Sequence, residues 1–293
     1  MPGPAHLPPP RRSGYTTTTD VPLYWAAYGP AAGAQAVVLH GGPGADHGYL
    51  LPQMLELADR RELLFYDQRG GGRSRGDDRE PVTWKTHVAD LGAVVRELGA
   101  APLTLIGYSW GGLLALLYAA AAAESPALPS PARLALIDPA PVSRQFREAF
   151  EAEFARRQAA PVVQAMRAEL LASGVRERDP QAFRQRAFEL SVAGYFANPR
   201  AARDLTPFRV VGRIQQSVWE SLGDYDLVGD GRLGAIRCPV LIVHGREDPI
   251  PLASSEACAH ALGAELVVLE ACGHVPYVER PVALFDALKR FLG

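Results

Sequence analysis

Cysteine is scarce in this sequence, and its scarcity excludes two common kinds of site. Cys238, Cys258 and Cys272 are the only cysteines among 293 residues, and no two of them share a C-x-x-C spacing. An odd, widely separated set favours neither a disulfide framework nor a zinc site. We therefore expect reduced thiols in a cytoplasmic protein.

Long apolar runs and an excess of one charge are also missing. Residues 113–123 form the most apolar helical stretch, which is too short to span a bilayer. Residues 1–14 are rich in proline and lack the apolar core of a signal peptide. The formal net charge is −2, which attracts neither nucleic acid nor an anionic membrane. We expect neither of these partners, and the oligomeric state stays open.

The glycine-rich segments lack the spacings that bind nucleotides. Neither G-x-x-x-x-G-K-[ST] nor G-x-G-x-x-G occurs, although glycine accounts for 28 residues. No cluster of His, Cys, Asp or Glu has the spacing of a metal site. The sequence therefore predicts chemistry without a cofactor or a metal ion.

Apolar segments of strand length alternate with segments of helical pattern. Hydrophobic residues make up 48% of the chain, enough for a sizeable core. The alternation predicts an α/β fold, a mostly parallel sheet with helices on both faces. The first two strands are predicted to form an antiparallel hairpin at the edge of this sheet. The expected strands are 15–19, 23–28, 36–39, 62–66, 103–106, 133–137, 238–243 and 265–269; the expected helices are 49–58, 83–98, 113–123, 252–262 and 281–292.

One long segment interrupts this alternation. Residues 141–234 contain no convincing strand and show a helical pattern of apolar residues. We expect an all-helical cap domain over the carboxyl edge of the sheet, where ligands of open α/β folds bind. The alternative is a separate helical domain with a role of its own. The other units are an N-terminal extension, 1–14, and a core domain formed by 15–140 and 235–293.

The centre of the predicted core is a G-x-S-x-G sequence between a strand and a helix. Residues 107–111 read Gly-Tyr-Ser-Trp-Gly, directly after the apolar run 103–106. In this setting the motif forms a nucleophile elbow, a strained turn that presents the serine at the edge of the sheet. We therefore expect Ser109 to be a catalytic nucleophile.

A serine hydroxyl needs a base beside it, and that base needs an acid to orient it. In folds with this elbow the partners follow in the order acid and then histidine. Asp248 and His274 each follow a predicted strand in that order. Asp138, at the end of the strand 133–137, is the alternative acid. His40 and His244 also end strands, and we expect them to brace loops by hydrogen bonds.

Acyl transfer also requires two N–H donors for the oxyanion. One is expected from Trp110, which follows the nucleophile. The other is expected from the glycine-rich loop 40–44, whose backbone can approach a substrate closely. Gly42 is the first choice, and Gly41 is the second.

Three motifs together resemble those of the proline iminopeptidase family of α/β-hydrolases. They are HGGPG at 40–44, DQRGGGRS at 67–74 and GYSWGG at 107–112. The resemblance covers about residues 20–140 and 235–293. It implies the α/β-hydrolase fold and removal of N-terminal residues, proline first, from short peptides. It also supports the triad and the oxyanion donors named above.

The resemblance further implies carboxylates that hold the free amino group of the substrate. An ammonium in a closed pocket needs such partners, because an unpaired buried charge is costly. Glu220 and Glu247 are the candidates. Two other functions stay open: a carboxylesterase or lactonase with the same triad, and a catalytically silent receptor that binds a small ligand.

Overall fold

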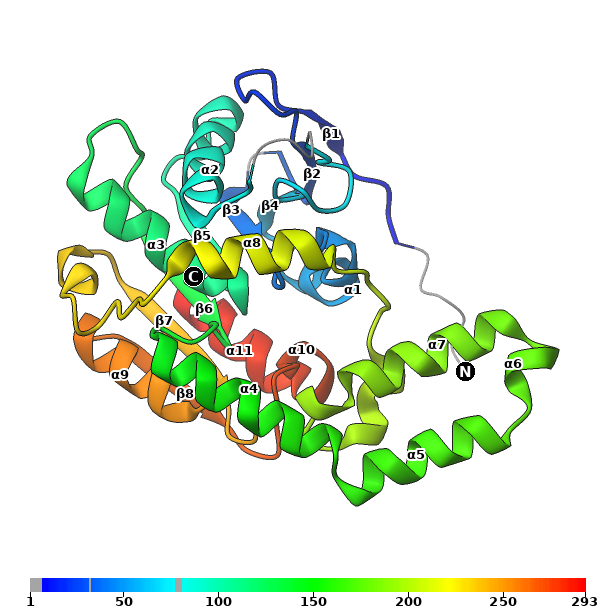
Figure 1. Cartoon of the computed structure of the whole chain (residues 1–293). Helices are drawn as coiled ribbons and strands as arrows, with labels where there is room; N and C mark the ends of the chain where they lie inside the picture. The colour runs from blue at the N-terminus through cyan, green and yellow to red at the C-terminus, as the bar shows by residue number, and fades with distance from the viewer. Residues whose placement is uncertain (1–6, 32, 77–80) are drawn as a thin grey trace.

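The computed structural model describes residues 7–31, 33–76 and 81–293. Its centre is one eight-stranded sheet with the order β1-β2-β4-β3-β5-β6-β7-β8 (Figure 1). The pairings of β1 with β2 and of β2 with β4 are antiparallel, and the rest of the sheet is parallel. The predicted fold class is therefore confirmed. The strands are β1 Arg12–Tyr15, β2 Tyr24–Tyr28, β3 Ala34–Leu39, β4 Arg61–Tyr66, β5 Thr104–Tyr108, β6 Arg133–Ile137, β7 Val240–Gly245 and β8 Glu265–Leu269.

Both faces of the sheet are covered, which explains why its central strands are apolar throughout. Successive side chains of a strand point to opposite faces. Leu105 and Ile242 accordingly pack in one hydrophobic cluster, and Ile106 and Leu241 pack in the other. Every residue of β4, β5 and β7 is buried. A strand that is buried on both faces has no polar face to expose.

The flanking helices divide between the two faces. The helices α2 Trp84–Leu98, α3 Trp110–Glu124 and α9 Leu252–Leu262 contribute to one cluster. The other cluster takes side chains from α1 Leu51–Met54 and α11 Pro281–Leu292. The first eleven residues of α3 are buried, so this helix is apolar on all sides rather than amphipathic. The helix that carries the nucleophile elbow is therefore fixed in the core.

Between β6 and β7 the described chain forms helices and one isolated bridge, Ser143 with Asp226. We propose that these residues form the cap domain expected at 141–234. The α-helices here are α4 Arg144–Gln158, α5 Pro161–Ala172, α6 Val175–Arg178, α7 Pro180–Val192 and α8 Gly212–Leu222; the 3-10 helices are η3 Ala193–Tyr195, η4 Pro199–Asp204 and η5 Arg232–Ala235.

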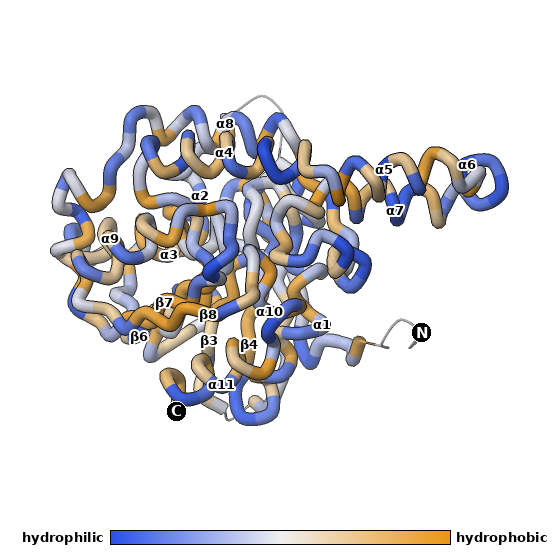
Figure 2. The backbone as a smooth tube through the Cα atoms, turned by 90° about the horizontal axis from the view of Figure 1, so that it is seen from below, coloured by the Kyte–Doolittle hydropathy of each residue, from blue (hydrophilic) through white to orange (hydrophobic). Residues whose placement is uncertain are grey.

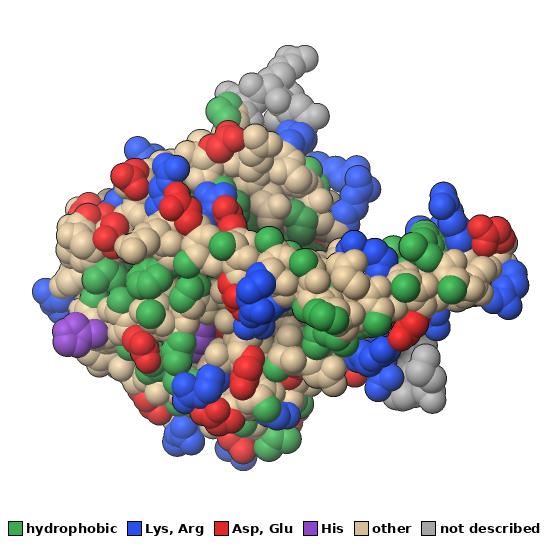
Figure 3. Space-filling view, turned by 60° about the horizontal axis from the view of Figure 1, so that its bottom comes forward, with side chains coloured by type: hydrophobic (Ala, Val, Ile, Leu, Met, Phe, Trp, Pro, Cys, Tyr) green, Lys and Arg blue, Asp and Glu red, His purple; other side chains and the backbone are tan. Residues whose placement is uncertain are grey.

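These helices differ in how they meet the core. Helices α5, α6 and α7 project as an arm, whereas α4 and α8 lie across the body of the molecule (Figures 1 and 2). Apolar side chains lie along the arm among charged ones (Figure 3), and Leu171 is 71% exposed. Helix α8 is bonded to the core, because the Trp84 amide donates to Ser221 Oγ (3.0 Å) and Ser217 Oγ donates to the Val82 carbonyl (2.8 Å).

The predicted hairpin is present, but its first strand lies earlier in the chain than expected. We predicted residues 15–19, whereas β1 is Arg12–Tyr15 and overlaps the predicted extension 1–14. The threonines that follow use their polar groups in a turn: Thr16 Oγ1 accepts from the Leu23 amide (2.8 Å), and Thr19 Oγ1 donates to the Val21 carbonyl (2.7 Å). Such side-chain hydrogen bonds compete with strand pairing. Residues 1–6 of the extension lie outside the described residues.

The helix predicted at 49–58 is divided into three short segments. These are η1 His47–Tyr49, α1 Leu51–Met54 and η2 Leu55–Leu57. Pro52 lies in the first turn of α1, where its missing N–H costs nothing. A longer helix running through Pro52 would lose a hydrogen bond there.

None of the helices in the described part of the chain is long and apolar enough to cross a membrane.

Candidate active site

Ser109 lies in a strained turn between β5 and α3. Its φ is 53° and its ψ is −119°, a conformation that a residue with a side chain rarely adopts. The turn requires glycine on both sides. A Cβ at Gly107 would lie 2.4 Å from the Gly111 carbonyl oxygen, and one at Gly111 would lie 2.2 Å from the Leu39 oxygen. The G-x-S-x-G spacing is therefore dictated by close backbone contacts.

The structure brings Ser109, His274 and Asp248 into one hydrogen-bonded row. His274 Nε2 lies 2.9 Å from Ser109 Oγ, and His274 Nδ1 lies 2.7 Å from Asp248 Oδ2. Asp248 Oδ1 accepts a second bond from the Ile250 amide (2.7 Å). These contacts place Nε2 as an acceptor for the serine proton and Nδ1–H as a donor to the carboxylate.

Main-chain and aromatic contacts fix the imidazole. The His274 amide donates to the Tyr195 carbonyl (2.7 Å), and the Tyr108 hydroxyl donates to the His274 carbonyl (2.8 Å). The rings of Tyr195 and Tyr108 lie 5.1 and 5.2 Å from the imidazole centroid. Tyr195 belongs to η3, so a helical segment between β6 and β7 helps to hold the candidate base.

Burial dominates the electrostatics of this row. It lowers the pKa of His274 to about 4, while the charge of Asp138 acts in the opposite direction. It raises the pKa of Asp248, against the effects of the neighbouring Asp138 and of the Ile250 amide. Burial and the neighbouring Asp248 raise the pKa of Asp138 well above its usual value. The site therefore favours a neutral imidazole and at least one protonated carboxyl group.

The lowered pKa of His274 predicts the pH dependence of turnover. A general base must be unprotonated, so activity falls as the pH falls through its pKa. We expect the acid limb of kcat/KM for a nitrophenyl ester to lie below the usual histidine value of about 6.5, towards about 4. Far-UV circular dichroism at each pH controls for unfolding. An apparent pKa of 6.5 or higher, with the fold intact, contradicts this expectation.

Two of the three predicted oxyanion residues lie beside Ser109. Gly42 and Trp110 both line a cavity with Ser109, and Trp110 is the first residue of α3, where the helix dipole favours negative charge. The Gly41 amide instead donates to the Tyr49 hydroxyl (2.8 Å). We therefore propose Gly42 and Trp110 as the donors and Gly41 as a structural residue of the loop.

The sequence did not indicate that Gln68 connects the two loops behind the oxyanion site. Gln68 Oε1 accepts from Trp110 Nε1 (2.8 Å), and its Nε2 donates to the His40 carbonyl (2.9 Å). His40 Nε2 in turn accepts from the Gln68 amide (3.1 Å). His40 thus braces its loop, as predicted. The position of Gln68 inside the DQRG motif was the available signal.

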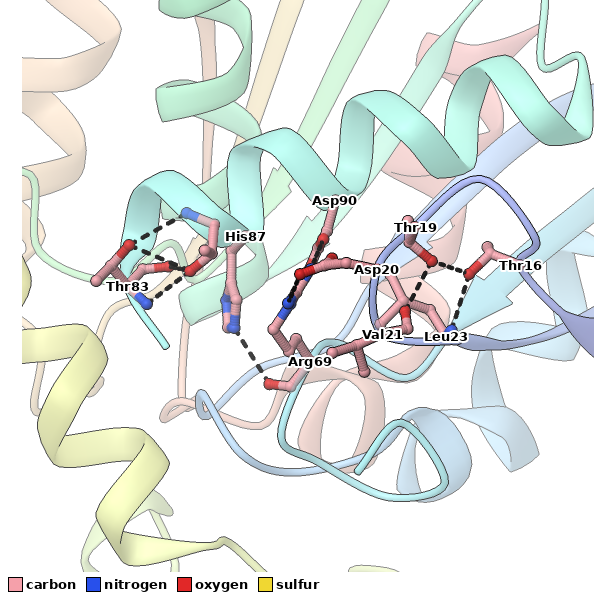
Figure 4. Close-up of polar contacts among 10 residues, drawn as sticks. Thr16, Thr19, Asp20, Val21, Leu23, Arg69, Thr83, His87 and Asp90 are labelled. Carbon is pink, nitrogen blue, oxygen red and sulfur yellow. Dashed lines mark hydrogen bonds and ion pairs between the residues drawn. The ribbon is translucent and has the colours of Figure 1, made fainter. Parts of the chain in front are cut away.

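Arg69, the next residue, anchors this loop to α2 (Figure 4). Its guanidinium donates to both oxygens of Asp90 (2.6 and 2.8 Å) and to Asp20 (2.5 and 3.0 Å). These bonds raise the pKa of Arg69, and the one to Asp20 lowers the pKa of that carboxyl to about 2. His87 Nε2 lies 3.3 Å from the Arg69 carbonyl oxygen. The network fixes the backbone that positions Gln68.

Two cavities of different character meet at Ser109. Both are lined by Gly42, Ser109, Tyr195, Gln215 and His274. The first, of about 330 Å³, adds the charged pair Arg147 and Glu151 together with Trp110, Phe150 and Trp219. The second, of about 280 Å³, adds aromatic and aliphatic side chains, including Tyr49, Tyr108, Phe188, Phe208 and Val210.

The predicted substrate carboxylates do not line either cavity. Glu220 accepts from Gln216 Nε2 (2.7 Å) on the exposed side of α8, and Glu247 accepts from the Cys272 amide (2.8 Å). Neither is among the described residues that line the cavities. The carboxylate found there is Glu151, which pairs with Arg147 (2.8 Å) in α4. Its place could not be predicted, because the α4 sequence carries charge on every turn.

Asp138, Asp248 and His274 place donor atoms within 4.8 Å of one another, close enough to hold a metal ion. His274 and Asp248 are already bonded to each other, however. We therefore interpret His274 and Asp248 as members of the hydrogen-bonded row that ends on Ser109, rather than as metal ligands.

The sheet, the elbow and the Ser-His-Asp geometry are those of an α/β hydrolase. A model of the Alpha/beta hydrolase family matches residues 36–287, and the chain belongs to this family. It is 29% identical over 282 residues to a proline iminopeptidase of Lactobacillus crispatus (strain ST1), covering 87% of this chain and 89% of the relative. The expected resemblance to proline iminopeptidases within the α/β-hydrolases is thus confirmed, and the protein is an enzyme of the hydrolase class.

Solved structures show the same fold. A proline iminopeptidase of Mycobacterium smegmatis aligns with a TM-score of 0.68 and 22% identity, over 96% of this chain and 99% of that one. An enol-lactonase of Burkholderia xenovorans LB400 aligns with a TM-score of 0.66 and 23% identity, over 95% and 99%. Hydrolases of peptide and of lactone bonds are therefore both similar to this chain in fold.

Proposed function

We propose that the chain is a serine hydrolase in which Ser109 attacks the scissile carbonyl. His274 accepts the serine proton at Nε2 and passes it to the leaving group, while Asp248 orients the imidazole and stabilises its cation. The amides of Gly42 and Trp110 stabilise the oxyanion. The observation that carries the proposal is the pair of contacts at 2.9 and 2.7 Å, which end on a serine in a nucleophile elbow.

The proposed substrates are short peptides with a free N-terminal residue, proline first. The name of the L. crispatus relative supports this class. A peptide ammonium needs a carboxylate partner, and the structure offers Glu151 in the larger cavity. We therefore assign the amino-group contact to Glu151 in place of Glu220 and Glu247.

A second candidate is hydrolysis of small uncharged esters or lactones. The smaller cavity favours this alternative. Among its described lining residues, His274 is the only basic one and none carries a carboxylate. An ammonium there would lack a counter-charge, whereas an apolar acyl group would fit. The similarity in fold to an enol-lactonase is consistent with this alternative.

The two candidates differ in their dependence on the charge of Glu151. We expect Glu151→Gln to lower kcat/KM for a prolyl nitroanilide at least about tenfold, because the substrate ammonium loses its partner. The effect is smaller than for a buried pair, since the Glu151 side chain is 54% exposed. Hydrolysis of butyryl nitrophenyl ester, measured in parallel, should change little.

Glu148→Gln is the matched control, because Glu148 pairs with Arg144 (3.0 Å) in the same helix α4 and neither residue is among the described lining residues of the cavities. It should leave both rates near those of the unmodified enzyme. N-acetylation of the prolyl substrate should reproduce the effect of Glu151→Gln, since it removes the same ion pair from the other side. If the acetylated and free substrates are cleaved equally fast, the aminopeptidase assignment is wrong and the esterase takes its place.

The cysteines support the proposed cytoplasmic setting. Cys238, Cys258 and Cys272 are all free thiols in the structure. Burial raises the pKa of Cys258 to about 12, so this thiol stays protonated and unreactive. A thiol of this kind contributes to packing rather than to chemistry.

A further inference from the structure

Asp138, the alternative acid, lies beside the proposed triad but outside the hydrogen-bonded row. It follows β6, is fully buried, and has a φ of 40°, which is unusual for a residue other than glycine. Its Oδ1 accepts from the Gly245 amide (2.8 Å). Its Oδ2 is buried and accepts no N–H or O–H from the described residues. A buried oxygen without a donor is costly if the carboxyl group is ionised.

The neighbour of Asp138 is the carboxyl group of Asp248. The carboxyl groups of Asp138 and Asp248 and the ring of His274 place polar atoms within 4.8 Å of one another. Two carboxyl groups at this separation can form a hydrogen bond with each other only if one of them holds a proton. At this distance, two buried carboxylates with a neutral imidazole would repel each other strongly.

The distribution of donors decides which group holds the proton. Asp248 accepts from the Ile250 amide (2.7 Å) and from His274 Nδ1 (2.7 Å), so two N–H donors stabilise its charge. Asp138 accepts one N–H, from Gly245. Hydrogen bonds to the ionised form favour ionisation. Asp248 is therefore the carboxylate, and Asp138 is the acid.

Among the residues that the structure describes, the other titratable groups near the pair provide no cation in direct contact with Asp138. His244 Nδ1 lies 3.7 Å from Asp138 Oδ1, but this nitrogen accepts a hydrogen bond from Ser255 Oγ (2.9 Å). The other ring nitrogen of His244, Nε2, donates to the Ile250 carbonyl (3.1 Å). Burial lowers the pKa of His244 to about 4, so its ring is neutral. Burial raises the pKa of each of the other neutral neighbours, which are Tyr108, Tyr277 and Cys272. The remaining charges, Arg157 and Glu279, act on Asp248.

We propose that Asp138 is a positioning residue whose protonated carboxyl group donates a hydrogen bond to Asp248 and holds that carboxylate towards His274. The catalytic effect of Asp138 rests on the proposed function, because Asp138 acts through the proposed triad. The protonation of Asp138 does not depend on the proposed function, because the state of a buried acid can also be measured from the stability of the fold.

The activity test compares two substitutions. Asp138→Asn keeps an acceptor for the Gly245 amide and an N–H donor for Asp248, whereas Asp138→Ala removes both. We expect Ala to lower kcat at least tenfold with little change in KM, and Asn to restore most of that loss. Asn should also leave the acid limb of the pH profile in place, since no charge is removed. A downward shift of that limb by about one pH unit in Asn would show that Asp138 is ionised and would overturn the proposal.

The stability test needs no substrate. A protonated native Asp138 means that the unfolded state, with its ordinary aspartate pKa of about 3.9, binds fewer protons above that pH. Stability then falls as the pH rises, and Asn removes this dependence. We expect the ratio of the unfolding constants, unsubstituted to Asp138→Asn, to increase about tenfold per pH unit above about pH 5 in urea titrations. A ratio that stays constant from pH 5 to 8 would refute the proposal. If it rises as expected in a protein that hydrolyses nothing, the proposed function alone is wrong.

Discussion

Replacing Ser109 by alanine is expected to reduce kcat by about 10⁶-fold, because removal of a triad nucleophile eliminates the covalent route. The substitution removes one hydroxyl group, and the elbow backbone is fixed by Gly107 and Gly111 rather than by the serine side chain. The fold should therefore persist. Hydrolysis of a nitrophenyl ester, followed over hours, measures the loss.

Labelling with a fluorophosphonate probe provides a second readout of the same change. The unmodified protein should form a covalent adduct at Ser109, and the alanine variant should form none. A silent receptor with the same fold would leave the unmodified protein unlabelled and inactive. Full turnover in the alanine variant, with correct mass and circular dichroism, would reject the proposed mechanism altogether.

Asp248→Asn is expected to lower kcat by about 10⁴-fold. The asparagine has the right shape, but its amide stabilises the wrong imidazole tautomer and carries no charge to balance the histidine cation. His274 Nδ1 would then lose its 2.7 Å contact with a carboxylate. Steady-state kinetics on one ester substrate suffice, with unfolding in urea to confirm stability.

The comparison with Asp138→Asn makes this experiment decisive. Asp138 lies at the end of β6, next to the same histidine, so either aspartate could have been the acid by position alone. Its direct bond, however, is to the Gly245 amide rather than to His274. The loss should therefore be far larger at Asp248. The opposite ranking would transfer the role of the acid to Asp138.

The sequence predicted the residues that short-range chemistry dictates. The elbow glycines, Ser109 and the order of Asp248 and His274 follow from local spacing and from the rule that parallel strands end at one edge. Strand β6 and helix α11 also match the predicted ranges, since an apolar run and an amphipathic period define them without ambiguity.

The sequence did not predict contacts that depend on packing between distant segments. Gln68 accepts a hydrogen bond from Trp110, which lies on a different loop. Glu151 lines the larger cavity because of the way α4 is rotated about its axis. Glu220 was equally plausible from its charge, but its carboxylate accepts from Gln216, and Glu220 is not among the described residues that line the cavities. Rotation of a charged helix about its axis is set by tertiary packing, which no local pattern records.

The helices above Ser109 are fastened to the core on two opposite flanks, by Tyr195 to the His274 amide and by Ser217 and Ser221 to residues near the start of α2. Lifting either flank would break these bonds, and lifting the first would also displace the candidate base. While these bonds hold, a substrate of the proposed hydrolase has to fit within cavities of about 330 and 280 Å³, a size that suits a dipeptide or a short ester.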